Sequence, residues 1–157
     1  MSTKGRKMKK VLLALVIGVS MSSASYSANT SKKNTTFNKP DIQLLVDIIA
    51  ERHNVPKDLA HAIVSLESNY DPTVTGKLGE IGLGQIRCGT ARSEGFKGKC
   101  TELYKPEVNL EYSMAYLRYA LDRTNNDICK AASFYSSGQV PRSNKTAYCR
   151  KMLTHLQ

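Results

Sequence analysis

A carboxylate on the apolar face of a predicted helix is the feature that most limits how this chain can fold. Aliphatic residues recur at the three- and four-residue spacing of one helix face, at Leu59, Ile63 and Leu66. Glu67 continues the same face. Pro56 suits the first turn, because its missing N–H would be unpaired there, and Asp71-Pro72 ends the helix. The pattern therefore predicts a helix with Glu67 in its last turn, on the buried face.

This placement predicts that the pKa of the Glu67 carboxyl is raised. Burial disfavours the charged carboxylate, and so does the negative end of the helix dipole. A carboxyl of this kind can act as a general acid near neutral pH. The alternative is a structural glutamate that pairs with a lysine or an arginine. This segment by itself leaves both interpretations open.

The first 28 residues have the composition of a secretory signal peptide. Residues 1–10 carry five basic and no acidic side chains, residues 11–19 are apolar apart from Gly18, and small residues follow to Ala28. The apolar run is too short to span a bilayer comfortably. We expect cleavage after Ala24 or after Ala28, export to the periplasm or out of the cell, and no membrane span after processing.

Residues 29–40 form a polar spacer, and residues 41–157 have a length that suits one domain with one core. The whole chain has a net charge of +10, and removing the five positive charges of the leader leaves about +5. This modest excess favours an anionic partner such as a cell-wall polymer. We expect no nucleic-acid partner, because basic and aromatic residues do not alternate along any stretch.

Four cysteines, an even number in an exported chain, predict two disulfides among Cys88, Cys100, Cys129 and Cys149. Three pairings are possible. We favour Cys88–Cys100, which closes one loop, and Cys129–Cys149, which ties two late helices together. The sequence has no C-x-x-C, and its histidines lack ligand spacing with the cysteines. We therefore expect no metal site and no cofactor.

The rest of the chain predicts an all-α domain with long loops. We expect further helices after Pro40, after Pro106, over residues 128–135, and at the C-terminus, where Asn144 is the predicted cap and Tyr148, Met152 and Leu153 face inward. Residues 73–87 and 88–106 are expected to be loops, with no strand. Of the three tyrosines in the helix after Pro106, at least two are expected in the core, because aromatic residues on a helix are more often core than cleft.

Three segments together resemble a known family. They are Glu67–Pro72, Gly82–Ile86 and Phe134–Gly138. In this order and spacing they resemble the E-S, G-L-M-Q and A-Y-N-A-G motifs of the soluble lytic transglycosylase (SLT) domain, which is related to goose-type lysozyme. The resemblance covers about residues 42–140.

The resemblance implies a lysozyme-like helical fold with a glycan cleft. It implies that Glu67 is the catalytic acid that cleaves the β-1,4 bond between N-acetylmuramic acid and N-acetylglucosamine in peptidoglycan. The substrate's own 6-hydroxyl then closes on C1, leaving a 1,6-anhydro end. By motif position, Gln85 hydrogen-bonds sugar, Tyr135 orients Glu67 or the sugar, Ser68 supports the helix end at the substrate site, and Ser136 occupies the usual asparagine position.

Three further departures from the family pattern concern the cleft. Gly84 replaces the usual methionine and is expected to remove an apolar cleft wall. Gly76 stands where a serine is common, and Glu80 stands where a small residue is common. Because Glu80 brings a second carboxylate to this region, the departures bear on the choice between a lyase and a hydrolase.

Two alternatives stay open. One is a muramidase that hydrolyses the same bond, with Glu80 or Asp71 as the base across the cleft. The other is a non-catalytic glycan-binding or assembly protein on the same scaffold. If the protein is an enzyme, the small domain suggests local wall opening, with a secretion or envelope-assembly complex as a partner.

Overall fold

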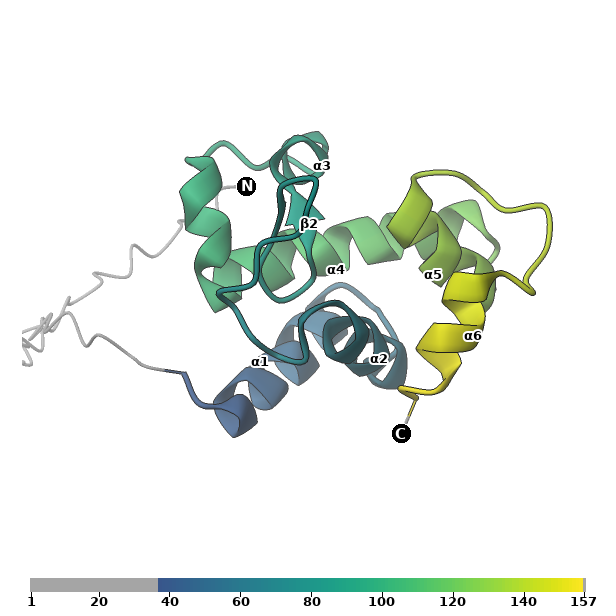
Figure 1. Ribbon diagram of the computed structural model, residues 1–157, viewed down its shortest axis with the longest axis horizontal. Coiled ribbons are helices and arrows are strands. Elements are labelled where there is room, and N and C mark those ends of the chain that lie inside the picture. Colours follow the sequence, from purple (N-terminus) through teal and green to yellow (C-terminus); the bar gives the residue numbers. More distant parts are fainter. Residues whose placement is uncertain (1–36, 157) are drawn as a thin grey trace, which may run out of the picture. The chain divides into compact units, whose positions relative to one another are not determined.

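The computed structural model describes residues 37–156, so the predicted leader and most of the polar spacer lie outside the described residues. The elements, in chain order, are α1 (Lys39–Arg52), α2 (Lys57–Ser68), β1 (Glu80–Ile81), β2 (Ile86–Arg87), α3 (Cys88–Ser93), the 3-10 helix η1 (Cys100–Tyr104), α4 (Pro106–Arg123), α5 (Ile128–Ser137) and α6 (Ala147–Leu153) (Figure 1). The all-α prediction is confirmed, with one small hairpin added.

Helix α4 is the central element of the described domain. Its inward face is formed by Leu110, Met114, Leu117 and Leu121, which are at most 1% exposed. It contacts α1, α5, α3, η1 and β2. Burying each such side chain contributes about 1.5–3 kcal/mol, so this face holds the helices together. Because α4 contacts both the other helices and the hairpin, it fixes the position of the hairpin relative to those helices.

Helices α1 and α2 begin and end at local signals. Asn38 caps α1 in a capping box with Asp41. Helix α2 ends at Ser68, and Asn69 adopts a left-handed conformation with φ of 51° immediately afterwards. The turn therefore comes before Asp71-Pro72, and it leaves Glu67 in the last turn of α2, as predicted.

Two predicted loops contain regular structure. Residues 73–87 include β1 and β2, which pair antiparallel with Glu80 opposite Arg87 and Ile81 opposite Ile86. Residues 88–106 include α3 and η1. The prediction of no strand was wrong, because strands of two residues are too short to show an alternating pattern.

The C-terminal helix also differs from the prediction. Thr146, not Asn144, caps α6, since its side chain accepts a hydrogen bond from the Cys149 N–H. Met152 is fully buried, whereas Leu153 is 44% exposed. The short helix presents only one side to the core, and Leu153 lies on the other.

The tyrosines of α4 do not follow the expectation for core residues. Tyr112 and Tyr116 are only partly buried against the core, and Tyr119 is 44% exposed. Aromatic rings on this helix therefore cover the edge of the core rather than fill it, which leaves one of them available to a neighbouring cavity.

Both favoured disulfides are present. Cys88–Cys100 has Cα atoms 5.5 Å apart and ties the start of α3 to η1. Cys129–Cys149 has Cα atoms 4.9 Å apart and joins α5 to α6. Each closes a short loop and so restricts the unfolded chain. Within residues 37–156, no helix is both long and apolar enough to cross a membrane.

Candidate active site

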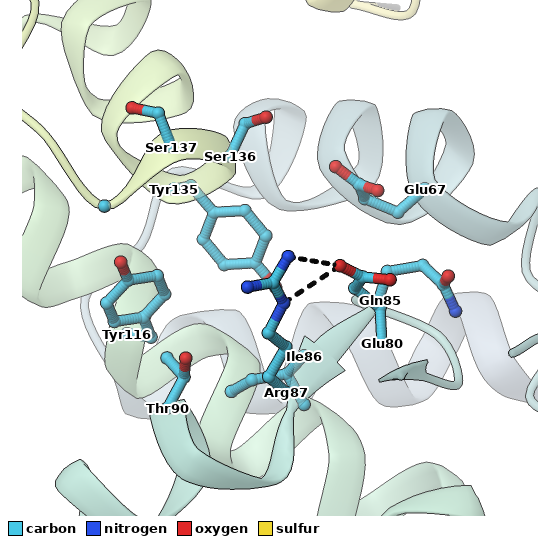
Figure 2. Close-up of a pocket in the computed structure, with 11 residues that line it drawn as sticks. Glu67, Glu80, Gln85, Ile86, Arg87, Thr90, Tyr116, Tyr135, Ser136 and Ser137 are labelled. Carbon is cyan, nitrogen blue, oxygen red and sulfur yellow. Dashed lines mark hydrogen bonds and ion pairs between the residues drawn. The ribbon is translucent and has the colours of Figure 1, made fainter. Parts of the chain in front are cut away.

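A cavity of about 380 Å³ lies where α2, the hairpin, α4 and α5 meet (Figure 2). Its lining combines carboxylates, a guanidinium, hydroxyls and aromatic rings, from Glu67, Glu80, Gln85, Ile86, Arg87, Thr90, Tyr116, Tyr135, Ser136, Ser137 and Gly138. The three motif segments, which are far apart in sequence, therefore meet at this cavity. Its polar lining suits a polar ligand such as a sugar.

Glu67 reaches this cavity from the last turn of α2. Its side chain is partly buried, and the hydroxyl of Tyr148 in α6 donates a hydrogen bond to its Oε1. Burial is the main cause that raises the pKa of Glu67 above the ordinary value of 4.5. Tyr148 and the charge of Lys151 act in the opposite direction, and the charge of Glu80 adds to the rise. The net effect favours the protonated form of this carboxyl relative to that of an ordinary glutamate.

The turn between β1 and β2 presents Gln85 to the cavity. Gln85 has a φ of 47° and Gly82 a φ of 67°, and the Gln85 N–H bonds the Gly82 carbonyl at 3.0 Å. The side-chain Nε2 donates to the carbonyls of Val74 and Gly82 at 3.1 and 3.0 Å. Since the amide nitrogen is used by the backbone, Oε1 is the atom that Gln85 can offer to a sugar hydroxyl.

Asn109 fastens this turn to α4. It is fully buried, and its Nδ2 donates to the carbonyls of Ile81 and Leu103, each at 2.7 Å. Its Oδ1 accepts from the Gly84 N–H at 2.8 Å. One side chain thus satisfies three backbone groups that would otherwise be buried without partners. No sequence motif marks Asn109, because its contacts are distant in the chain.

Ser68 and Ser136 take different positions. Ser68 is buried and does not line the cavity, and its hydroxyl donates to the Leu83 carbonyl at 2.8 Å. It ties α2 to the Gly82–Ile86 segment, so it supports the site rather than contacting a ligand. Ser136 is exposed in the lining, so its hydroxyl is available there.

Tyr135 forms a wall of the cavity, but its hydroxyl is not directed at Glu67. The hydroxyl donates to the Gly84 carbonyl at 2.6 Å, and burial raises its pKa. The hydroxyl that contacts Glu67 belongs to Tyr148 instead. The helical pattern predicted that Tyr148 faces inward on the last helix, but no motif marks its position or suggests a role.

The sequence suggested that Gly84 removes part of the cavity wall, but the structure shows no such gap. A Cβ there would lie 2.6 Å from the Ser113 Cβ and 2.8 Å from the Tyr135 hydroxyl oxygen. The missing side chain therefore points at α4 and α5, where no space exists, and Gly84 allows the turn to approach α4 closely.

Glu80 and Arg87 form an ion pair across the hairpin (Figure 2). Arg87 donates from Nε and Nη2 to Glu80 Oε1, at 2.9 and 2.7 Å, and the Leu78 N–H donates to Oε2 at 2.9 Å. The bond from Arg87 is the main cause that lowers the pKa of Glu80. The ionised form of this second carboxyl is therefore favoured, and Arg87 and the Leu78 N–H already bond its oxygens.

Asp71 lies outside the cavity lining. Its carboxylate accepts from the Thr73 hydroxyl and N–H at 2.7 and 2.8 Å, and these bonds lower its pKa. It acts as a turn residue after α2.

Comparison with known proteins agrees with this geometry. Residues 45–155 match the family described as the transglycosylase SLT domain. The endo-type membrane-bound lytic murein transglycosylase A of Citrobacter koseri is 36% identical over 74 residues, which are 43% of this chain and 36% of that protein. The match thus spans about a third of the length of that relative.

Solved structures share the fold. The 70 kDa soluble lytic transglycosylase SLT70 of Escherichia coli has a TM-score of 0.61 at 22% identity, over 69% of this chain and 23% of that one. An inactive Glu-to-Gln mutant of the lytic transglycosylase Slt from Pseudomonas aeruginosa has a TM-score of 0.59 at 22% identity, over 61% of this chain and 16% of that one. With most of the described domain covered by the family match, the chain belongs to the transglycosylase SLT domain family.

Proposed function

We propose that this protein is a peptidoglycan lytic transglycosylase in which Glu67 is the single general acid and base. The observation that carries the proposal is the state of Glu67, a carboxyl with a raised pKa in a sugar-sized polar cavity. The family match over residues 45–155 supports the same activity. The lytic transglycosylase Slt, which has this fold, is inactive in a Glu-to-Gln mutant.

The first step breaks the bond between C1 of N-acetylmuramic acid and O4 of N-acetylglucosamine. Glu67 gives its proton to O4 as that oxygen leaves, and positive charge develops at C1. Oε1 is engaged by Tyr148, and among residues 37–156 Oε2 has no hydrogen-bond partner, so Oε2 carries the proton that is transferred. The Tyr148 hydroxyl then stabilises the carboxylate that is formed.

The second step uses the same carboxylate as a base. The 6-hydroxyl of the N-acetylmuramic acid attacks C1 and gives its proton to Glu67. The product carries a 1,6-anhydro ring, no water is consumed, and Glu67 returns to its protonated form. Since the nucleophile belongs to the sugar being cleaved, it is already near C1, which lowers the entropic part of the barrier. The Gln85 Oε1 and the Ser136 hydroxyl bind sugar hydroxyls.

The engagement of Glu80 favours this route over hydrolysis. A glycoside hydrolase ordinarily uses a second carboxylate, either as a base that activates water or as a nucleophile. Glu80 is held by Arg87 and the Leu78 N–H, and its lowered pKa makes it a weak base. Asp71 lies outside the lining. Both observations support the lyase over a hydrolase that uses Glu80 or Asp71 as its base.

The predicted leader extends the proposal to the cell. A signal peptide over residues 1–28 would deliver the protein to the periplasm, where peptidoglycan lies. We propose that it opens the wall locally for a secretion or envelope-assembly complex, because the described part of the chain contains little beyond the family domain. This role can be tested by comparing the number of assembled envelope complexes in wild-type cells and in cells that lack the protein. We expect fewer complexes in the cells that lack it.

Product analysis tests the proposed reaction. Purified peptidoglycan is incubated with the oxidised protein, and the released muropeptides are analysed by mass spectrometry before and after borohydride reduction. We expect products one water lighter than hydrolytic ones and resistant to reduction. Glu67→Gln is expected to lower the rate by about 10³-fold or more while preserving the helical circular-dichroism spectrum.

Glu80→Gln separates the lyase from the muramidase. A lyase keeps forming anhydro products in this variant, whereas a hydrolase that uses Glu80 loses activity. Reducible products from the wild type would contradict the proposal in favour of hydrolysis. Binding of glycan without any product, in both the wild type and Glu67→Gln, would indicate a glycan-binding protein.

A further inference from the structure

Arg87 extends from β2 into the cavity, between Glu80 and the ring of Tyr135 (Figure 2). Its side chain is 53% exposed, while that of its partner Glu80 is 21% exposed. The cavity therefore contains one guanidinium that faces the same space as Glu67. A fixed positive group of this kind does not enter the proton transfers by Glu67, so it calls for a function of its own.

The ion pair uses only one side of the guanidinium. Nε and Nη2 donate to Glu80 Oε1, and among residues 37–156 Nη1 has no hydrogen-bond partner. Guanidinium groups bind carboxylates through two parallel N–H bonds from adjacent nitrogens. The edge formed by Nη1 and Nη2 remains open for such a ligand, and Glu80 holds it in a fixed orientation.

The surrounding sequence makes room for this pair. A Cβ at Gly76 would lie 2.9 Å from the Glu80 Cβ and 2.8 Å from the Gln85 Oε1. A larger residue at position 76 would thus displace the Glu80 side chain. Glu80 and Arg87 also face each other in the register of β1 and β2. The glycine and the two charged residues form one arrangement that directs Arg87 into the cavity.

The substrate of the proposed reaction has a matching group. N-acetylmuramic acid differs from N-acetylglucosamine by a lactyl ether at O3, on the ring whose C1 is attacked. That lactyl group ends in a free carboxylate when the peptide stem has been removed, and otherwise carries a stem with its own carboxylates. A carboxylate therefore lies close to the scissile bond in either form of the glycan.

We infer that Arg87 is a specificity residue that binds a carboxylate of the muramic acid substituent, with Glu80 as its positioning residue. The inference rests on the proposed function, because it assumes a muramyl glycan in the cavity. The two carboxylate sources, the free lactyl group and the peptide stem, share this chemistry and are separated by experiment. Neutral sugars such as chitin fragments lack the group and would be bound less well.

Binding to an inactive background tests the inference without turnover. Calorimetry with Glu67→Gln is performed on glycan strands with free lactyl carboxylates and on the same strands converted to neutral methylamides. Stem-bearing strands, with stem carboxylates free or amidated, form a second pair. We expect about tenfold tighter binding of the charged member of at least one pair, and the pair concerned identifies the source.

Substitutions assign that preference to Arg87. Adding Arg87→Gln is expected to abolish the preference, and Arg87→Lys to retain only part of it, since lysine keeps the charge but not the planar fork. Glu80→Gln is expected to reduce the preference for charged strands, because Arg87 loses the ion pair that orients it. The matched control is Arg123→Gln, an exposed arginine outside the cavity lining, which should keep the full preference.

Other outcomes overturn the inference. Equal binding of charged and neutral strands by the Glu67→Gln protein would contradict it. An equal loss of affinity for both kinds of strand when Arg87→Gln is added would also contradict it, because Arg87 would then contact sugar hydroxyls. The proposed function is judged separately, by anhydro products from the wild type. Absence of those products with a retained carboxylate preference would reject the reaction and keep the binding site.

Discussion

At the scale of single residues, the proposed chemistry depends on opposing effects on the pKa of one carboxyl. Burial favours the neutral form of Glu67, while the Tyr148 hydroxyl favours the charged form, and burial prevails. The balance suits a group that must give a proton and then take one back. A fully exposed glutamate would lose its proton at a lower pH. A buried glutamate without Tyr148 would need more free energy to form its carboxylate.

Changing Tyr148 to Phe tests this balance. Removing the donated bond destabilises the charged form, so the pKa of Glu67 should rise further. In the proposed reaction, activity requires protonated Glu67 and falls as pH rises through that pKa. The alkaline limb of the kcat/KM profile should therefore move up by about one pH unit, the equivalent of a bond of about 1.5 kcal/mol to a charged group. The limiting rate should fall by about tenfold.

The control for this experiment is Tyr104→Phe, since Tyr104 also bonds through its hydroxyl, to Thr75 at 2.6 Å, but lies outside the cavity lining. A purely structural role for Tyr148 would lower activity at every pH without moving the limb. A downward shift of the limb would contradict the assigned direction of the hydrogen bond.

At the scale of elements, the hairpin is held in place by α4. Strands of two residues have little stability of their own, because few groups pair along them. Asn109 supplies bonds to the carbonyls of Ile81 and Leu103 and to the Gly84 N–H, and Gly84 permits the close approach. The positions of Gln85, Glu80 and Arg87 thus follow from contacts made by a helix that begins some twenty residues later.

Asn109→Ala tests that dependence. The change leaves buried backbone groups without partners, and we expect a loss of about 3 kcal/mol in the free energy of unfolding, measured by urea titration. The exposed Asn144 is the matched control, and Asn144→Ala should change stability by less than about 0.5 kcal/mol. An equally small effect at both positions would show that the hairpin is held by other contacts.

At the scale of the whole domain, the same carboxyl links pH to stability. The folded chain binds the Glu67 proton more tightly than the unfolded chain does, because its folded pKa is raised above 4.5. Stability contributed by this group is therefore present at low pH and is lost as pH rises from 4.5 through the folded pKa. Glu80 and Asp71, with lowered pKa values, act oppositely and lose their contribution as pH falls.

Glu67→Gln should remove the loss of stability at higher pH. Compared with the wild type, the variant should gain stability progressively as pH rises from 4.5 through the folded pKa of Glu67, by a few degrees in Tm. Thermal unfolding at a series of pH values measures the difference. Glu107→Gln, at an exposed glutamate outside the cavity lining, is the matched control. A constant difference between Glu67→Gln and the wild type across this range would contradict the burial of Glu67.

Features that depend on neighbours along the chain could be predicted before the fold was known. Helical spacing predicted Glu67 in the last turn of α2 and the buried leucines of α4. The even cysteine count predicted two disulfides but left three pairings possible, and the structure has the favoured one. Motif order also identified Gln85, Tyr135 and Ser136 as residues of one site, and all three line the cavity.

The contacts between side chains that are distant in sequence could not be predicted and follow from the packing of the folded domain. Tyr148 lies 81 residues after Glu67, and Asn109 lies 25 residues after Gly84. The ion pair of Arg87 with Glu80 needs a hairpin too short to show a pattern, and the fit of Gly84 depends on Ser113 in another helix. Local propensities act over a few residues, whereas these contacts arise when packing on α4 brings distant segments within bonding distance.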